Sequence, residues 1–209
     1  MHQALAHARD LARLGVHKQL ANRLLEPFAW HTALFTATEW SNFGNLRCSK
    51  DAQPEIRAAA ELMFVAMRDS VPRALKHGEW HLPYVSSEER MRFTADEAVK
   101  ISAARCARVS YLRQEGIREP SEDLELYDRL VGPGHLSPLE HPCRPMTEAE
   151  RDLFAQPEVF WNGEAWERTG RTLHFLGNVN GWIQHRKLVR GEADILGHRA
   201  RVERARLAL

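Results

Sequence analysis

Two short blocks of polar residues, each set inside an otherwise apolar stretch, constrain this chain most. The first runs from Ala33 to Ile56 and reads ALFTATEWSNFGNLRCSKDAQPEI, and the second runs from His135 to His141 and reads HLSPLEH. Asn, Arg, Ser, Glu and His stand in them at fixed spacings, whereas a packed core favours aliphatic side chains. A plain amphipathic helix does not need this pattern, so the blocks indicate a ligand.

Composition narrows the class of protein. A chain of 209 residues can bury a core, and its length favours a single domain over 1–209. The 29 basic and 28 acidic side chains nearly cancel, so we expect neither a nucleic acid nor a membrane surface as partner. No apolar run approaches the roughly 20 residues that span a bilayer. The first residues also lack the apolar part of a signal peptide, so the expected location is cytoplasmic.

The three cysteines, Cys48, Cys106 and Cys143, lie far apart and without CxxC spacing. This spacing predicts reduced, mostly structural thiols rather than a disulfide framework or a thiolate metal site.

The spacing of apolar side chains predicts a mostly helical chain. Alternating residues predict one strand over 32–38, and scattered Pro, Gly and aromatic residues over 72–93 predict a surface connector. We therefore expect an α+β fold, helix-rich with a small mixed or antiparallel sheet, and a basic, frayed tail over 190–209. The predicted helices span 7–14, 16–25, 39–47, 54–69 and 94–109, with two more at Ser121 and after Thr147, and short strands and turns are expected over 160–166 and 178–182.

Local signals support several of these helices. Capping boxes are predicted from Thr94 with Glu97 and from Thr147 with Glu150. The helix over 54–69 begins with a proline, which suits a first turn. Its buried face is predicted to consist of Ile56, Ala59, Ala60, Met63, Ala66 and Met67.

The predicted helix of the first block carries Asn42 and Asn45 one turn apart and Arg47 in its last turn. Positions three apart share a helix face, and the arginine reaches beyond the helix end. Amides and a planar guanidinium together match the polar edge of a heterocycle. Alternatively, the Asn side chains only solvate the helix and Arg47 pairs with Asp51 or Glu55. The spacing leaves both interpretations open.

In the second block, His135 and His141 flank Ser137 and Glu140 across a turn that contains a proline. Histidines six residues apart lack the i, i+4 geometry of helical zinc motifs, so we expect no metal here. A hydroxyl and a carboxylate that leave a tight turn suit a ribityl or ribose chain. The alternative is a local network in which Ser137 caps the turn and Glu140 pairs with Arg144.

Arginines on apolar helices need anionic partners, because an unpaired cation is costly to bury. This applies to Arg23, Arg105 and Arg108, for which carboxylates and a phosphate are both open. The run from Gln184 to Arg186 either supplies further donors or is solvated. No GxGxxG, GxxxxGK[ST] or GxSxG motif occurs, which sets aside the enzymes that depend on them.

Taken together, these blocks resemble the flavin-dependent thymidylate synthase family, which methylates dUMP with FAD. NFGNLRCSKDAQPEI is similar to the family pattern NFxxLR followed by AQxEI, ARVSY at 107–111 is a second match, and HLSPLEH resembles HxSPxEH. The resemblance covers most of residues 14–187, and three ordered blocks are specific where each alone is weak.

The resemblance implies a role for each matching residue. Arg47 and His135 are the catalytic positions: Arg47 contacts the uracil ring and stabilises its developing negative charge, and His135 lies near the flavin. Arg23 is a second dUMP-binding arginine. One good donor contributes roughly 3 kcal/mol to such stabilisation in a dry site. The FAD-contacting positions implied are Asn42, Ser110, Ser137, Glu140, His185 and Arg186.

The resemblance also implies partners. FAD is the cofactor, NADPH and methylenetetrahydrofolate are co-substrates, and the protein is a homo-oligomer, a tetramer by resemblance, whose sites draw on several subunits. No protein nucleophile is required, which agrees with the absence of a cysteine and histidine pair of the papain type.

Two departures from the family pattern are visible. The hallmark Arg-His-Arg, followed after seven residues by Ser, is replaced by Gln184-His185-Arg186 and Asp194, and an acid there repels a phosphate. The Asn/Arg helix also precedes the other two blocks, which resembles a longer branch of the family whose N-terminal part is missing here.

Three hypotheses follow. The first is a flavin-dependent thymidylate synthase, and the second is a truncated or degenerate, noncatalytic homologue that binds nucleotide or flavin, or assembles with a complete subunit. The third is a helical nucleic-acid-binding module that uses the basic C-terminus, against which the near-zero net charge argues.

Overall fold

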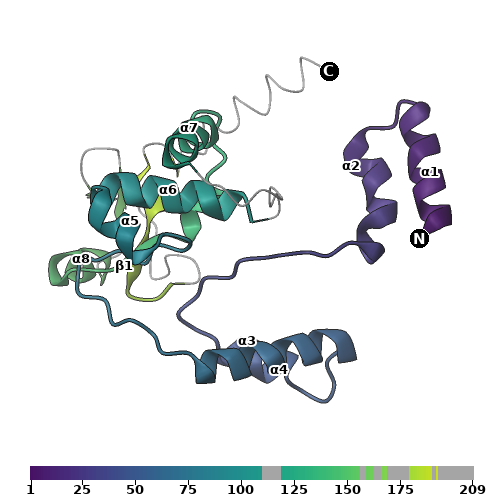
Figure 1. The fold of residues 1–209 in the computed structure, drawn as a ribbon. Coiled ribbons are helices and arrows are strands. Elements are labelled where there is room, and N and C mark those ends of the chain that lie inside the picture. Colours follow the sequence, from purple (N-terminus) through teal and green to yellow (C-terminus); the bar gives the residue numbers. More distant parts are fainter. Residues whose placement is uncertain (110–118, 156–158, 162–165, 169–178, 190–191, 193–209) are drawn as a thin grey trace. The chain divides into compact units, whose positions relative to one another are not determined.

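The computed structural model describes residues 1–109, 119–155, 159–161, 166–168, 179–189 and 192 (Figure 1). The chain consists of two compact units, Met1–Ala33 and Leu34–Leu209. With η marking a 3₁₀ helix, the elements are α1 (His2–Arg13), α2 (Lys18–Ala21), η1 (Asn22–Phe28), α3 (Ser41–Arg47), α4 (Pro54–Asp69), α5 (Ser87–Arg92), α6 (Ala95–Ala107), α7 (Pro120–Val131), η2 (Ser137–Glu140), β1 (Cys143–Pro145), α8 (Glu148–Ala155), β2 (Val159–Trp161), β3 (Trp166–Arg168), β4 (Trp182–Gln184) and η3 (His185–Leu188).

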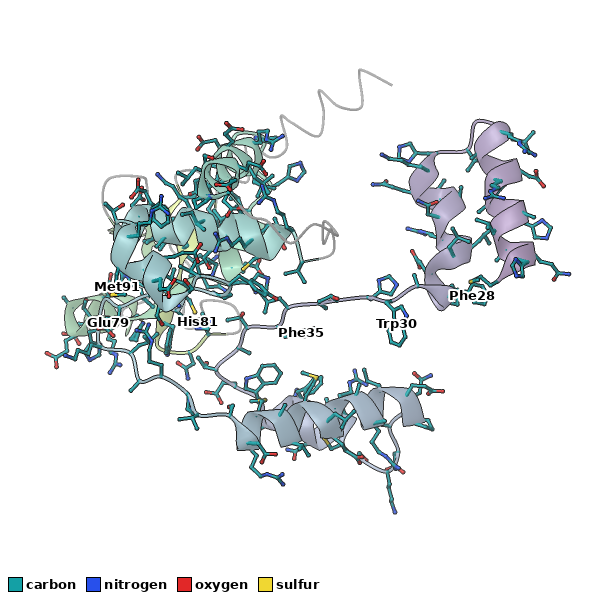
Figure 2. All side chains as sticks on the ribbon, viewed as in Figure 1. Phe28, Trp30, Phe35, Glu79, His81 and Met91 are labelled. Carbon is teal, nitrogen blue, oxygen red and sulfur yellow. The ribbon has the colours of Figure 1, made fainter. Side chains whose placement is uncertain are left out.

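The first unit is a pair of helical segments joined at Gly15. This glycine has φ +80°, a conformation that ends a helix and that side chains disfavour. The second predicted helix is shorter than expected, because α2 gives way to η1, which contains Pro27. Proline has no amide hydrogen for an i to i−4 bond. Phe28 and Trp30 are exposed at the end of this unit (Figure 2).

The strand predicted over 32–38 is wrong, because these residues form no strand in the structure. Their hydroxyl groups, rather than a backbone ladder, make the contacts to the rest of the second unit. Thr36 and Thr38 each take part in one such hydrogen bond. We call residues 34–40 the connector hereafter.

Helices α3 and α4 form a hairpin that packs through aromatic rings. The rings of Phe43 and Phe64 stack with centroids 6.3 Å apart. Gly44 allows this approach, because a Cβ there would lie 2.9 Å from Cζ of Phe64. The predicted bounds of α4 are confirmed, but its predicted buried face is largely wrong: Ala60 is buried, whereas Ile56 is 40% exposed.

Helices α5, α6 and α8 begin with reciprocal caps. The capping boxes predicted at Thr94 and Thr147 are confirmed. A third capping box, between Ser86 and Glu89, opens α5. The sequence analysis did not predict this helix within residues 72–93. Ser121 does not cap α7, because Pro120 occupies the first helical position and Glu119 is the N-cap.

Two small antiparallel sheets complete the described fold. Strand β1 pairs with β4 in the register Cys143 to Gln184, and β2 pairs with β3. His81 adds an antiparallel bridge to Cys143. The expected helix-rich α+β class with a small sheet is confirmed. Among the described helices, none combines the length and apolar character that crossing a membrane requires.

Helix α6 lies at the centre of the core. Ile101, Ala103 and Ala104 are fully buried on it, and it packs along α7 (Figure 1). Two of the three free thiols, Cys106 and Cys143, are also buried. Burial raises the pKa of each to about 12, so both stay protonated near neutral pH.

A buried ionic cluster ties α6 to α5 and α7. The guanidinium of Arg105, only 4% exposed, donates from Nε to Asp123 Oδ2 at 2.7 Å and from its terminal nitrogens to both oxygens of Glu89 at 2.6 and 2.8 Å. It also donates to the carbonyl of Tyr84 at 2.7 Å. Arg108 pairs with the second oxygen of Asp123. The bond from Arg105 lowers the pKa of Glu89 to about 2.

Asp123→Ala is expected to destabilise the protein by about 3–5 kcal/mol, because it leaves the charge of Arg105 buried with one partner fewer. Chemical denaturation measures this loss. The matched control is Glu125→Ala on the exposed side of α7, with an expected change within about 0.5 kcal/mol. Equal effects of the two substitutions would contradict a structural role for the cluster.

Candidate functional site

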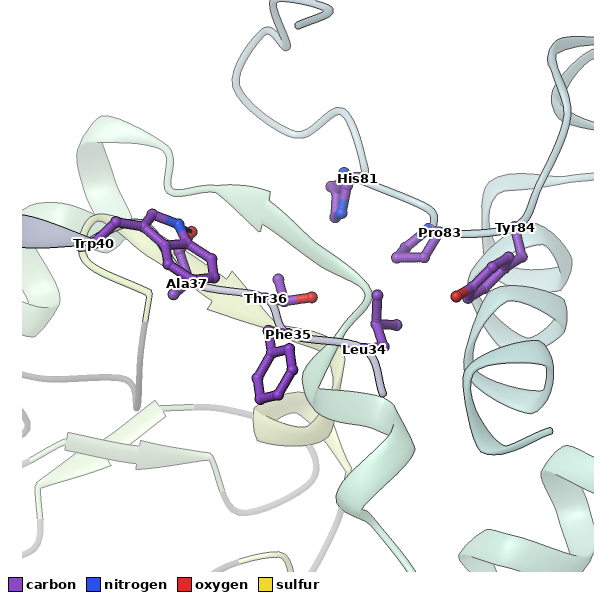
Figure 3. Close-up of a pocket in the computed structure, with 8 residues that line it drawn as sticks. All are labelled: Leu34, Phe35, Thr36, Ala37, Trp40, His81, Pro83 and Tyr84. Carbon is purple, nitrogen blue, oxygen red and sulfur yellow. Dashed lines mark hydrogen bonds between the residues drawn. The ribbon is translucent and has the colours of Figure 1, made fainter. Parts of the chain in front are cut away.

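A pocket of about 430 Å³ lies between the connector and the segment that leads into α5. Figure 3 shows the two segments facing each other, with Thr36 opposite His81 and with Trp40 and Tyr84 towards the two ends. Its lining residues are mostly aromatic or aliphatic and include no carboxylate, lysine or arginine: Leu34, Phe35, Thr36, Ala37, Trp40, His81, Pro83 and Tyr84. Such walls suit a flat, uncharged ring.

The backbone at the rim of the pocket is held in an unusual conformation. Tyr84 has φ +62°, which non-glycine residues rarely adopt. The bond from Arg105 to its carbonyl helps to hold it there. The rim therefore depends on the ionic cluster described above.

The pocket lies beside the end of the second motif. Thr36 Oγ1 and His141 Nδ1 share a hydrogen bond of 3.1 Å. Two residues later, Cys143 exchanges backbone hydrogen bonds with His81, at 2.7 and 3.3 Å. The segment 141–143 therefore contacts both walls of the pocket.

Both histidines beside the pocket have lowered pKa values. Burial lowers the pKa of His141 and, together with the positive charges of Arg90 and Arg73, that of His81. Neutral imidazoles can both donate and accept hydrogen bonds, so the pocket carries polar groups without a net charge near neutral pH.

The HLSPLEH turn folds as the 3₁₀ helix η2. Glu140 pairs with Arg186 of η3, which also donates to Glu192 at 2.8 Å. The predicted alternative, a bond from Glu140 to Arg144, is wrong, because Arg144 pairs instead with Glu150 at 2.7 Å. The structure thus brings together two of the implied FAD-contacting residues, as partners of each other.

His185 lies in a buried polar contact next to this pair. Its Nε2 lies 2.8 Å from the hydroxyl of Tyr127, and its ring packs edge-on against Trp80. Burial lowers its pKa to about 4, so the ring is neutral near pH 7. In the hallmark run, Gln184 is buried, whereas Asp194 lies outside the described residues.

The residues of the Asn/Arg helix are placed differently. Asn42 and Arg47 are exposed on α3, and within the described part of the chain neither side chain has a hydrogen bond or ion pair. The alternative partners Asp51 and Glu55 are not used by Arg47 in the structure. Neither Asn42 nor Arg47 lines the pocket, although the connector leads directly into their helix.

The other predicted site residues are also exposed. Arg23 lies on η1 of the first unit, and His135 and Ser137 lie at the start of the HLSPLEH turn. Ser110 falls outside the described residues. Among the described residues of the second unit, Asn42, Arg47, His135 and Ser137 do not line the pocket.

The structure shows which anions bind Arg105 of α6 and Arg108, the C-cap of that helix. Arg105 and Arg108 bind Asp123, and Arg105 also binds Glu89. These carboxylates, rather than a phosphate, are therefore their anionic partners. In the part of the chain that is described, no three His, Cys, Asp or Glu side chains are grouped to hold a metal ion.

Sequence reasoning missed one wall of the pocket, whereas the other wall, the connector, lies within the first polar block. The aromatic residues of WHLPY over 80–84 were assigned to a surface connector, and Thr36 to a strand. A usable signal was present in the SSEER run after this segment, which predicts a helix start and so a fixed position for the residues before it.

His185 is expected to make stability depend on pH. Because its pKa is about 4 in the folded protein and about 6.5 when unfolded, the unfolded chain binds more protons between these values. Stability therefore falls as pH drops from 6.5 towards 4, at most by about 1.4 kcal/mol per pH unit. His185→Gln should remove this part of the slope in denaturation curves across that range. The exposed control His31→Gln should keep it, and identical slopes in both variants would refute the assignment.

Comparison with known protein families finds one match. Residues 1–73 match the model of the family described as thymidylate synthase complementing protein. The matched region contains Arg23, Asn42 and Arg47, whereas the other predicted site residues lie outside it. No curated protein and no solved structure matches the chain. Over its first 73 residues the chain is therefore similar to the thymidylate synthase complementing proteins, which confirms the family resemblance seen in the NFGNLR and AQPEI block.

Proposed function

We propose that this chain is a flavin-dependent thymidylate synthase that methylates dUMP to dTMP. The observation that carries the proposal is the match over residues 1–73, because it contains the NFGNLR and AQPEI block with its exposed Asn42 and Arg47. Donors with no partner in the described chain lose no protein contact when a ligand engages them.

The described residues suit the ring of a flavin better than its phosphates. The aromatic pocket offers flat, uncharged walls beside both motifs. By contrast, the charge of Arg186 is already balanced by Glu140 and Glu192. When bound, FAD supplies the redox chemistry that links NADPH oxidation to transfer of the methylene carbon of methylenetetrahydrofolate to C5 of dUMP.

The chain's own residues bind and orient the reactants in this proposal. Arg47 donates to the uracil carbonyls and stabilises negative charge on the ring. Arg23 binds dUMP, Asn42, Ser110, Ser137, Glu140, His185 and Arg186 contact FAD, and His135 lies near the reacting ring.

We further propose that the active site is completed by other copies of the chain in a homo-oligomer. In the described part of the second unit, none of the predicted site residues lines the pocket, which supports this proposal. Helix α4 also exposes apolar side chains, including Leu62, which is 69% exposed, and Val65, which is 43% exposed. Apolar faces of this kind are common at subunit interfaces.

A second candidate is a noncatalytic homologue that binds nucleotide or flavin, or assembles with a complete subunit. Gln184 at the hallmark position favours it, because an amide cannot replace the charge of an arginine toward a phosphate. Formation of dTMP by the isolated chain from dUMP, NADPH and methylenetetrahydrofolate would exclude this candidate.

The purified protein is expected to bind FAD. Binding should give a visible flavin absorption spectrum after removal of free cofactor, and added FAD should raise the melting temperature, because a ligand that binds only the folded state stabilises it. A colourless protein whose melting temperature FAD does not change would overturn the proposal.

Arg47→Ala is expected to weaken dUMP binding about 100-fold, as loss of one charge-assisted donor does, with little change in stability. Calorimetry measures the first effect and thermal unfolding the second. Arg57→Ala on the neighbouring helix α4 is the matched control and should keep dUMP affinity. If Arg47→Ala lowers the melting temperature and leaves dUMP binding intact, the arginine is structural.

A further inference from the structure

Two threonine hydroxyls attach the connector to the body of the second unit. Thr36 shares a 3.1 Å hydrogen bond with His141, and Thr38 Oγ1 accepts from the backbone amide of Asn180 at 2.7 Å. His141 lies just before β1, which begins at Cys143, and Asn180 lies just before β4, which begins at Trp182. These two strands pair with each other, so both attachment points belong to the same small sheet.

The connector is in turn locked to the start of α3. Trp40, the N-cap residue of α3, donates from its indole nitrogen to the carbonyl of Ala37 at 3.0 Å. Its ring meets Phe43 edge-on at 5.8 Å. Trp40 therefore links the segment that Thr36 and Thr38 hold to the first turn of the Asn/Arg helix.

The far side of the pocket is attached to the same sheet. The bridge between His81 and Cys143 fixes the chain that returns from α4. The α3–α4 hairpin is thus attached at its entry by the side-chain bonds of Thr36 and Thr38. The chain that follows α4 reaches the body through the backbone bridge at His81 and through His77, whose Nδ1 lies 2.6 Å from the carbonyl oxygen of Met146.

We propose that Thr36 and Thr38 form a two-point clamp that positions the Asn/Arg helix relative to the HLSPLEH turn. Thr38 is a positioning residue, since it acts through the connector and the sheet rather than on a ligand, whereas Thr36 also lines the pocket. The functional part of this inference rests on the proposed flavin site, whereas the clamp itself stands on the two hydrogen bonds.

Amide hydrogen exchange tests the clamp without reference to function. In Thr38→Val, a methyl group replaces the acceptor of the Asn180 amide, and exchange at that amide should become roughly fivefold faster, as expected for loss of one hydrogen bond. Thr38→Ser keeps the acceptor and should restore the slow rate. Thr32→Val, which lies outside the connector, is the control and should leave this amide unchanged.

FAD affinity tests the positioning role. Thr38→Val is expected to bind FAD about tenfold or more weakly, since small displacements of binding groups are costly. Thr38 is not among the residues that line the pocket, so the effect would be indirect. Thr38→Ser should bind FAD as the wild type does. Flavin fluorescence gives the dissociation constants, and thermal unfolding shows whether each variant is folded.

The outcomes separate the two proposals. Unchanged exchange at Asn180 in Thr38→Val overturns the clamp. Faster exchange with unchanged FAD affinity in Thr38→Val overturns the positioning role. If the wild-type protein does not bind FAD, the proposed function and the positioning role both fail, while the exchange measurement still decides whether the clamp exists.

Discussion

The buried contact between Arg105 and Asp123 is the interaction on which the second unit depends. Asp123 is fully buried on α7 and Arg105 almost so on α6, and charges removed from water to this extent require well-aligned partners. Glu89 of α5 completes the cluster. Three helices that are short by themselves are thereby fixed in one arrangement, and the residues before α5 form one wall of the pocket.

The helices that could be predicted are those with a local signal. Pro54 and the capping boxes at Thr94 and Thr147 specify helix starts through neighbouring backbone bonds, so no tertiary information is needed. The strand over 32–38 could not be judged in this way. A strand requires a partner, and its alternating residues bind through two hydroxyl groups to positions more than 100 residues away.

In the candidate site, too, local sequence signals predict some features, and others depend on partners that only the fold provides. Residue types and spacing identified the motif residues, and the partner of Glu140 still had to come from the fold, because Arg186 lies on a different element. The pairing of Arg105 and Arg108 with carboxylates was one of two open alternatives. The pocket as a whole could not be predicted, because one wall lies within the first polar block but the other, at 81–84, carries no recognisable ligand-binding motif.

Tyr84 connects the stability of the fold to the shape of the pocket. Its side chain lines the cavity, while its carbonyl, turned by a left-handed backbone, accepts a bond from the same guanidinium that binds Asp123 and Glu89. Positions 89, 105 and 123 therefore do not vary independently. Because every residue carries a backbone carbonyl, a new side chain at position 84 can reshape this cavity for another ring and keep the bond, whereas a change at 89, 105 or 123 disturbs the interior of the protein as well.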